Sequence, residues 1–355
     1  MTAIQQINRV FLLACAPFLG MLIWLLFVTA NVHIAPWTTE ASVPISFQQD
    51  TTLLNAKLTK ANSDAIQTKS IIQQYFDLYE KSTAQVTALL QNTAAQAAKP
   101  SMIYDARITA KLGSPIKTAS SGNIDLKLFS LNESNYKGYA LKVNLKSDKA
   151  IKLVLGKDKI GSSESTLDAA ARYGAVAGVN AGGFADDNKG KRYPLDTTIM
   201  NGKYVNGFFP TNNDTTFIGL NKDRKLIGGK FSSQSELDKL NPLMGSTFVP
   251  VLLKNGSKMS IPYQWQSSPA RAARTIMANY KHDQLLFIVT DGYDESGNSG
   301  ATLAELQDKL QQLGVVDAYN LDGGGSSTLV MNGSVINRPS DGKLRPLATH
   351  FLFFK

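Results

Sequence analysis

Residues 50–98 contain neither glycine nor proline, and this feature limits most strongly what the chain can fold into. Apolar and small side chains recur along the stretch at alternating spacings of four and three, which is typical of a coiled-coil seam. Several seam positions are polar or small, so a single helix lying on a folded domain is an alternative. The following Lys99-Pro100 pair predicts the end of the helix, because proline disfavours helical angles before it. We expect a helical stalk over residues 36–100 and a possible homo-oligomer through it.

Residues 10–30 carry no charge, and about 20 apolar helical residues suffice to cross a bilayer. Arg9 precedes this segment and no Lys or Arg follows before Lys57, so the positive-inside rule places the N-terminus in the cytoplasm. The sequence predicts a single-pass cell-membrane protein, with a cytoplasmic tip and signal-anchor in residues 1–35 and an extracellular C-terminal domain. The lipid bilayer would be contacted through residues 10–30. A cleaved signal peptide is the alternative, because small residues end the segment.

Residues 101–355 have the pattern of a folded domain, with short alternating apolar runs between clusters of Gly, Asn and Ser. One apolar run ends at Asp291, an amphipathic helix follows, and the next run ends at Asp322. A strand, helix and strand with this spacing suggest a parallel crossover, which places both aspartates at one edge of the sheet. The predicted fold class is mixed α/β (α+β), a twisted, partly parallel sheet with flanking helices, preceded by the transmembrane helix and the long stalk.

The net charge of +9 favours polyanionic partners, whether nucleic acid, anionic lipid or a phosphate-bearing polymer. No basic helix or aromatic stacking platform accompanies the charge, so we expect no nucleic-acid partner. The single cysteine excludes a disulfide scaffold and a thiolate zinc site. The residues call for no cofactor, although a divalent cation between Asp291 and Asp322 stays open.

Asp291 and Asp322 could act as nucleophile, as general base or as ligands for a hard cation, although tight turns use Asp-Gly for structure alone. Three glycines and three hydroxyl residues follow Asp322, and such segments expose backbone N–H groups that cradle anions. Arg274 lies at the start of an apolar run, where a guanidinium requires a carboxylate or a phosphate partner. A structural ion pair is the alternative for Arg274.

Several distinctive segments follow one another along the chain. They are GVNAGGF (178–184), a Pro-containing segment (194–203), ARTIMA (273–278), VTDGY (289–293), SGATLAEL (299–306), NLDGGGSSTLVMNG (320–333), INRPS (336–340) and the closing Arg345. Taken in this order, they resemble the phosphodiester glycosidase family, which includes N-acetylglucosamine-1-phosphodiester alpha-N-acetylglucosaminidase-like enzymes and bacterial exopolysaccharide biosynthesis proteins. The resemblance covers about residues 101–355.

The resemblance implies hydrolysis of a sugar-1-phosphodiester and a phosphate-bearing glycan as the substrate. The leaving phosphomonoester has a second pKa of about 6, so it departs more easily than a sugar alkoxide. The remaining tasks are to neutralise the phosphate charge and to stabilise an oxocarbenium-like centre. The implied catalytic residues are Asp322, Asp291 and Arg274, and the implied substrate-binding residues are Asn180, Gly183, Thr275, Gly300, Thr302, Gly323, Gly324, Ser326 and Arg345.

The sequence therefore predicts a membrane-anchored extracellular hydrolase that cleaves N-acetylglucosamine-1-phosphodiester-like bonds in exopolysaccharide or cell-wall glycopolymer. Two alternatives belong to other classes. One is a non-catalytic module that binds anionic glycopolymer on a stalk, and only turnover separates it from an enzyme. The other is a metal-dependent phosphodiesterase, which would release sugar phosphate instead of free sugar.

Overall fold

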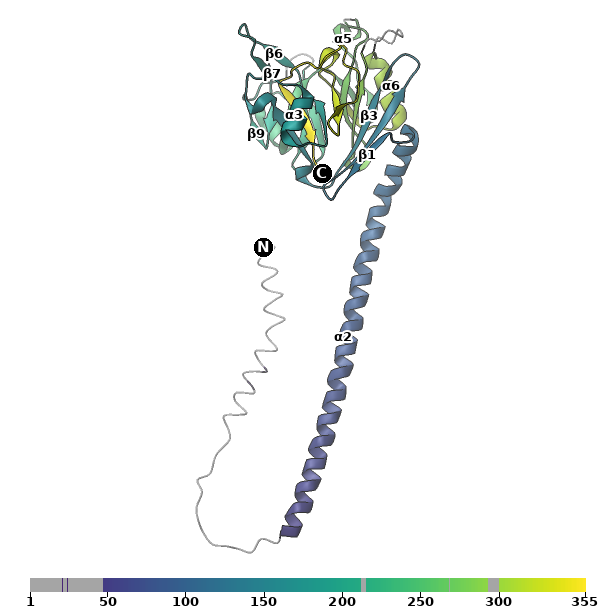
Figure 1. Ribbon diagram of the computed structural model, residues 1–355, viewed down its shortest axis with the longest axis vertical. Helices are drawn as coiled ribbons and strands as arrows, with labels where there is room; N and C mark the ends of the chain where they lie inside the picture. The colour runs from purple at the N-terminus through teal and green to yellow at the C-terminus, as the bar shows by residue number, and fades with distance from the viewer. Residues whose placement is uncertain (1–20, 22–23, 25–46, 212–214, 268, 293–299) are drawn as a thin grey trace. The chain divides into compact units, whose positions relative to one another are not determined.

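A computed structural model of the chain describes residues 21, 24, 47–211, 215–267, 269–292 and 300–355 (Figure 1). The described residues divide into two units, with the boundary between residues 88 and 89. All the strands, the short helices and the predicted site belong to the second unit.

Helix α2 (Phe47–Leu112) continues through Pro100, so the prediction that it ends at Lys99-Pro100 is wrong. Tertiary contacts compensate for the proline, because Ile108 and Leu112 are buried in the second unit. Asp105, on the same turns, forms ion pairs with Lys127 and Lys142. The side chains described for residues 51–97 are exposed, and the coiled coil and the homo-oligomer stay predictions.

Within the part of the chain that the structure describes, no helix combines the length and the apolar character that a bilayer crossing requires. This finding corrects the predicted single-pass localisation, with its cytoplasmic N-terminus and extracellular C-terminal domain, and the transmembrane helix in the predicted fold class. Helix α2 is long enough to cross a bilayer, but polar and charged side chains are distributed along it, so it lacks the apolar character. The segment proposed to contact the bilayer, residues 10–30, lies outside the described residues except for Met21 and Trp24.

The largest sheet has eight strands in the order β1-β2-β3-β16-β15-β17-β13-β14. Three adjacent strands near its centre, β16, β15 and β17, carry the predicted catalytic residues at their ends. The strands are β1 (Lys117–Ser120), β2 (Ile124–Asn132), β3 (Lys137–Leu145), β16 (Leu285–Thr290), β15 (Thr275–Asn279), β17 (Asp317–Leu321), β13 (Val251–Lys254) and β14 (Ser257–Lys258).

The remaining strands form two five-stranded sheets and one hairpin. The first sheet is β19 (Ser334–Val335), β18 (Leu329–Met331), β5 (Ala177–Asn180), β20 (Thr349–Phe353) and β4 (Ile151–Leu155). The second is β11 (Leu226–Gly229), β10 (Thr216–Asn221), β12 (Pro242–Phe248), β8 (Ile199–Met200) and β9 (Lys203–Tyr204), and the hairpin is β6 (Phe184–Asp186) with β7 (Arg192–Pro194).

Every strand pairing in the described residues is antiparallel, so the predicted partly parallel sheet is wrong. The physical reason is the position of β15, which lies between β16 and β17 and pairs with both in the antiparallel sense. Strands β16 and β17 therefore run in the same direction, as expected for a crossover, but they do not pair with each other. Their carboxyl ends still reach the same edge of the sheet.

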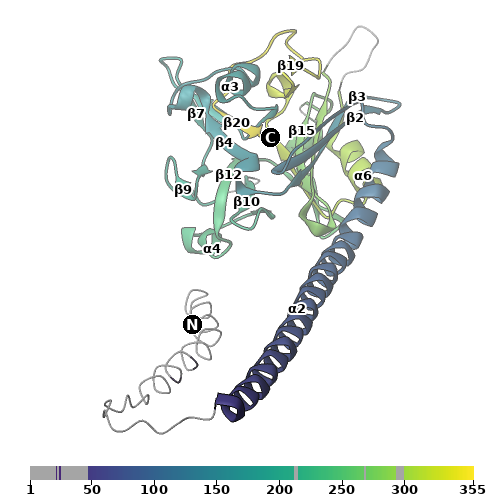
Figure 2. The same ribbon diagram turned by 60° about the horizontal axis from the view of Figure 1, so that its bottom comes forward.

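The main core lies between the eight-stranded sheet and the five-stranded sheets, where Phe287, Tyr319 and Phe351 are fully buried. Helix α6 (Leu303–Leu313) covers the other face of the large sheet with four leucines, and α3 (Thr166–Tyr173) covers the sheet that contains β20. Figures 1 and 2 show these two helices on opposite sides of the sheets. The remaining short helices are α4 (Gln234–Asp238) and α5 (Tyr263–Ser267).

Candidate active site

The predicted catalytic residues lie at the ends of three adjacent strands of the large sheet. Thr275 begins β15 and is paired with Val289 of β16 on one side and with Leu321 of β17 on the other. Arg274 therefore precedes β15 at the edge where Asp291 follows β16 and Asp322 follows β17. Neighbouring strands are about 4.8 Å apart, so the two strand ends that carry the aspartates are separated by roughly 10 Å.

Asp322 occupies a half-buried position beside the glycine-rich segment. Burial raises the pKa of its carboxyl to about 6, against the opposing effects of the Ser326 hydroxyl and the Gly323 N–H. The Gly323 N–H donates to Oδ1 at 3.0 Å, and the charges of Arg345 and Arg192 also favour the ionised form. A carboxyl group with a pKa near 6 can exchange a proton close to neutral pH or serve as a reactive carboxylate.

Arg274 is 3% exposed, and its guanidinium has only backbone carbonyl partners among the described residues. Nη2 donates to the oxygen of Pro269 at 2.8 Å, and Nε donates to the oxygen of Ala301 at 3.4 Å. Burial lowers its pKa to about 10, which still leaves the group cationic at neutral pH. A buried cation without a carboxylate within the described residues is a favourable site for an anionic ligand.

Backbone contacts join Arg274 to the Asp322 segment. The Gly324 N–H donates to the oxygen of Ala273 at 2.7 Å, and a Cβ placed on Gly323 would lie 3.8 Å from Cδ of Arg274. The structure therefore brings Arg274 and Asp322 to one edge, as predicted from the sequence.

Asp291 lies at the same edge but faces a different group of residues. Its Oδ1 accepts a hydrogen bond from the Arg338 N–H at 2.7 Å. With Tyr139, Arg338 and Lys343 it lines a cavity of about 590 Å³, to which Asp322 does not contribute. Asp291 and Asp322 therefore face different groups of residues at this edge.

Asn180 and Thr275, predicted to bind substrate, form a buried hydrogen-bond network beneath the glycine-rich segment. The Asn180 amide donates to the backbone oxygen of Asp322 at 2.7 Å, and its Oδ1 accepts from Thr275 Oγ1 at 2.8 Å. Thr275 Oγ1 also lies 3.1 Å from Ser327 Oγ. Both side chains are fully buried, so the structure places them in positioning roles for the Asp322 turn.

The three consecutive glycines have different environments. Gly324 has a φ of +59° and nothing within 4 Å of where a Cβ would lie, so its backbone borders open space. A Cβ on Gly325 would collide with the ion pair of Arg345 and Asp341, which is 2.7 Å long. The room left by Gly325 is thus filled by the protein itself.

Arg345 and Arg192 bring positive charge to the Asp322 side of the edge. Arg345 Nη1 lies 3.4 Å from the hydroxyl of Ser326, which is itself fully buried. Arg192 of the β6–β7 hairpin pairs with Asp186 and stacks 3.9 Å from the ring centre of Phe184. Sequence reasoning did not include Arg192 in the site, because a basic residue in a polar loop carries no local signal of its partner.

Gly183 and Gly300 lie against other parts of the protein. A Cβ on Gly183 would contact Phe248 at 2.8 Å, and one on Gly300 would collide with Ala272. Their lack of a side chain permits protein packing at these points, and the sequence could not distinguish this from room for a ligand.

Thr302 caps the N-terminus of α6 and forms a capping box with Glu305. Its hydroxyl accepts from the Glu305 N–H at 3.1 Å, which occupies the group predicted to bind substrate. We expect Thr302→Ala to lower the free energy of unfolding by about 1 kcal/mol, because a cap is lost. Urea unfolding and steady-state kinetics check this prediction, and a fall in kcat/KM beyond about threefold would contradict a purely structural role.

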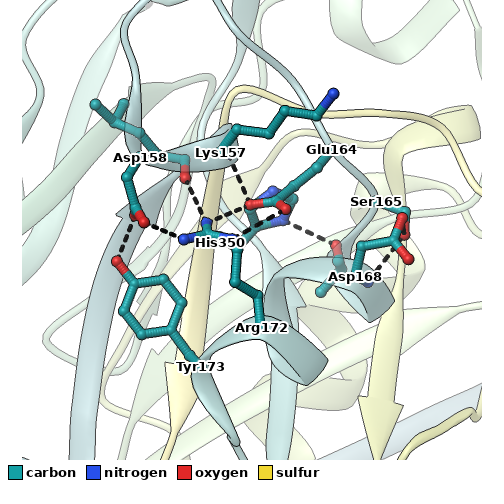
Figure 3. A network of polar contacts seen from close by, with 10 residues as sticks. Lys157, Asp158, Glu164, Ser165, Asp168, Arg172, Tyr173 and His350 are labelled. Carbon is teal, nitrogen blue, oxygen red and sulfur yellow. Dashed lines mark hydrogen bonds and ion pairs between the residues drawn. The ribbon is translucent and has the colours of Figure 1, made fainter.

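His350 is fully buried in β20. Its Nδ1 lies 3.1 Å from the hydroxyl of Thr166, and burial lowers its pKa to about 4. Figure 3 shows the surrounding network, in which Arg172 forms ion pairs with Glu164 and Asp158. A neutral, enclosed imidazole of this kind cannot supply acid-base chemistry to the edge where Asp322 lies.

Asn337 is a structural residue that the sequence analysis missed. It is 4% exposed, accepts from the Leu329 N–H at 2.7 Å and donates to the oxygen of Ser327 at 2.9 Å. These bonds fix the loop after β19 to the hydroxyl segment. The block INRPS contains it, but nothing local in that block shows its partner.

Among the described residues, no group of three or more His, Cys, Asp or Glu side chains is arranged to hold a metal ion. A cation between Asp291 and Asp322 would have no third ligand of these types there. The edge carries Asp322 and the buried cation of Arg274 on adjacent strand ends, an arrangement that suits a reaction that separates a sugar from an anionic leaving group.

A sequence profile described as phosphodiester glycosidase matches residues 173–354. Two curated N-acetylglucosamine-1-phosphodiester alpha-N-acetylglucosaminidases, from Bos taurus and Homo sapiens, are 29% identical over 195 and 191 residues, each half of this chain. The Mus musculus enzyme is 31% identical over 138 residues, 35% of this chain. The matched regions span 35%, 36% and 26% of the bovine, human and mouse proteins.

Two solved structures share the fold. The zebrafish N-acetylglucosamine-1-phosphodiester alpha-N-acetylglucosaminidase catalytic domain, auto-inhibited by its pro-peptide, has a TM-score of 0.55 and 22% identity, covering 68% of this chain and 87% of that chain. A hypothetical protein from Synechocystis has a TM-score of 0.50 and 15% identity, covering 68% of this chain and 64% of that chain.

Proposed function

Since the chain belongs to the phosphodiester glycosidase family, we propose that residues 101–355 form a hydrolase that cleaves sugar-1-phosphodiester bonds. The observation that carries the proposal is the placement of Asp322 and Arg274 on adjacent strand ends. One is a carboxyl group with a pKa raised to about 6, and the other is a buried guanidinium free of carboxylate partners among the described residues.

In the proposed reaction Arg274 holds the phosphate, and Arg345 and the N–H groups of the glycine-rich segment assist it. The bond between C1 of the sugar and the phosphate oxygen breaks, and the electron pair leaves with the phosphomonoester. This leaving group needs no strong acid, because its second pKa is about 6. The positive charge that develops at C1 is stabilised by the ionised Asp322, with Asp291 as the second candidate.

Water then adds to C1 and gives up a proton, so the products are a free sugar and a phosphomonoester. The relatives' names support an N-acetylglucosamine-1-phosphodiester as the sugar donor. We propose a phosphate-bearing exopolysaccharide or cell-wall glycopolymer as the natural substrate, because the chain has a net charge of +9 that attracts polyanions.

The full chain incubated with a synthetic N-acetylglucosamine-1-phosphodiester tests this function. We expect free N-acetylglucosamine and a phosphomonoester, identified by mass spectrometry and phosphorus NMR, at the same rate with and without a chelator. Sugar 1-phosphate that disappears on adding the chelator would indicate a metal-dependent phosphodiesterase. Binding without any product would indicate a non-catalytic glycan-binding module.

A further inference from the structure

A cavity of about 250 Å³ lies at the opposite end of β15 and β17 from Asp322. Its walls come from the last turns of α2, from the residues after β15 and from the C-terminal end of α6. Three of the lining residues are basic and none is acidic. They are Arg107 and Lys111 of α2 and Lys281 of the loop, and aromatic walls come from Tyr104 and Tyr280.

The carboxylates near this cavity are already paired with other cations. Asp105 binds Lys127 at 2.8 Å and also Lys142, and Asp317 binds Lys254 at 2.9 Å. None of these acids lines the cavity, so its positive charge is not balanced by a lining residue.

The three basic residues differ in the contacts that they already make. Lys111 donates to the oxygen of Gln312 at 2.9 Å, at the end of α6. Arg107 and Lys281 are exposed, and neither forms an ion pair with another described residue, since the nearby acids Asp105 and Asp283 pair with other lysines. Two cations are therefore available for an anion that enters the cavity.

The loop that carries Lys281 has an unusual backbone. His282 and Asp283 have φ angles of +66° and +60°, which side chains other than glycine rarely adopt. Asp283 on this turn forms a long ion pair with Lys225, at 3.8 Å. The ring of His282 meets the ring of Tyr104 edge to face at 4.7 Å, which holds the loop against α2.

We propose that this cavity is a remote subsite for a phosphate group of the glycan substrate, and the proposal rests on the proposed function. Five strand residues separate the Asp322 end of β17 from the cavity end, on the order of 17 Å along a strand that is buried throughout. A substrate that reaches both places must follow the protein surface, so it must be a polymer of several units with more than one phosphate. Tyr104, which is half-buried, supplies an aromatic face against which a sugar ring can pack, whereas Tyr280 is buried and only closes the cavity floor.

The test compares a polymer of N-acetylglucosamine 1-phosphate units with a small methyl phosphodiester of N-acetylglucosamine, using the full chain. We expect Arg107→Ala with Lys281→Ala to raise KM for the polymer about fivefold to tenfold, because two cation contacts are lost. Kinetics on the small substrate should not change. The matched control removes two exposed lysines elsewhere, Lys203→Ala with Lys239→Ala, and should leave both substrates unaffected.

Equal KM values for the polymer in the cavity variant and the wild type would overturn the proposal, as would an equal rise in the control variant. Calorimetric binding of the polymer to the inactive Asp322→Asn protein separates this inference from the function. Binding that depends on the cavity but is never followed by cleavage in the wild type contradicts only the function. A single-stranded DNA of equal charge that competes equally would overturn the assignment to a glycan, and thermal unfolding verifies that the variants are folded.

Discussion

Asp322→Asn is expected to lower kcat for a sugar-1-phosphodiester on the order of a thousandfold and to stabilise the fold at neutral pH. The loss follows because asparagine keeps the shape and the hydrogen-bond acceptor for the Gly323 N–H but carries no negative charge for C1. The gain in stability follows because burial, which raises the pKa of the Asp322 carboxyl, also makes its ionised form costly in the folded protein. Residues selected for reactivity often destabilise the fold in this way.

The sign of the stability change follows from the pKa values. The carboxyl has a pKa of about 6 in the folded protein and 3.8 as its ordinary value, so folding favours the protonated form. Ionisation therefore reduces stability as pH rises from about 4 to 6, and the full penalty is present above pH 6. Asparagine does not ionise and so avoids this penalty. We expect the free energy of unfolding of the variant to rise by about 1–2 kcal/mol at pH 7.5 and to change very little near pH 4.

Urea unfolding at these two pH values, together with single-turnover kinetics, measures both effects. Asp308→Asn is the control, since it removes an exposed carboxylate on α6 that pairs with Lys258, and Asp291→Asn shows how much of the loss belongs to the second candidate. A stability gain with full activity would remove Asp322 from the reaction while keeping the account of its pKa. A variant that is inactive and less stable at pH 7.5 would contradict that account.

Arg274→Met is expected to lower kcat/KM about a hundredfold to a thousandfold, because the buried guanidinium is the proposed phosphate contact. Inorganic phosphate should inhibit the wild type competitively and should no longer inhibit the variant. The stability should change little, because two hydrogen bonds to carbonyls are lost while a buried cation is removed. The replacement has a similar length and fills much of the same space.

Inhibition kinetics and urea unfolding check this expectation, with Arg224→Met as the control for loss of a positive charge. Arg224 forms an ion pair with Asp148, away from the Asp322 edge. Unaltered phosphate inhibition in Arg274→Met would show that the anion binds elsewhere. Equal losses in both variants would point to long-range charge and not to a contact.

The strands and the helix near the site could be predicted from the sequence, but the order in which the strands pair could not. The runs that became β16, α6 and β17 were visible as an apolar stretch, an amphipathic stretch and a second apolar stretch. Their common direction also followed from the crossover. The insertion of β15 between them did not, because pairing order depends on contacts between segments far apart in the chain.

The same limit applies to the long helix and to the predicted binding residues. Pro100 is a local stop signal, but burial of Ile108 and Leu112 outweighs it. The family resemblance implied Asn180 and Gly183 as substrate-binding residues. The structure surrounds both with protein atoms, and composition alone cannot show whether a close neighbour is a ligand or another segment.

Hydrolysis in water enriched in oxygen-18 tests the central claim most directly, because it shows which bond breaks. The full chain is incubated with an N-acetylglucosamine-1-phosphodiester, and both products are analysed by mass spectrometry before the sugar exchanges its anomeric oxygen. The account predicts that the heavy oxygen enters C1 of the released sugar and that the phosphomonoester contains none. Heavy oxygen in the phosphate would mean attack at phosphorus and would contradict the roles given to Asp322 and Arg274.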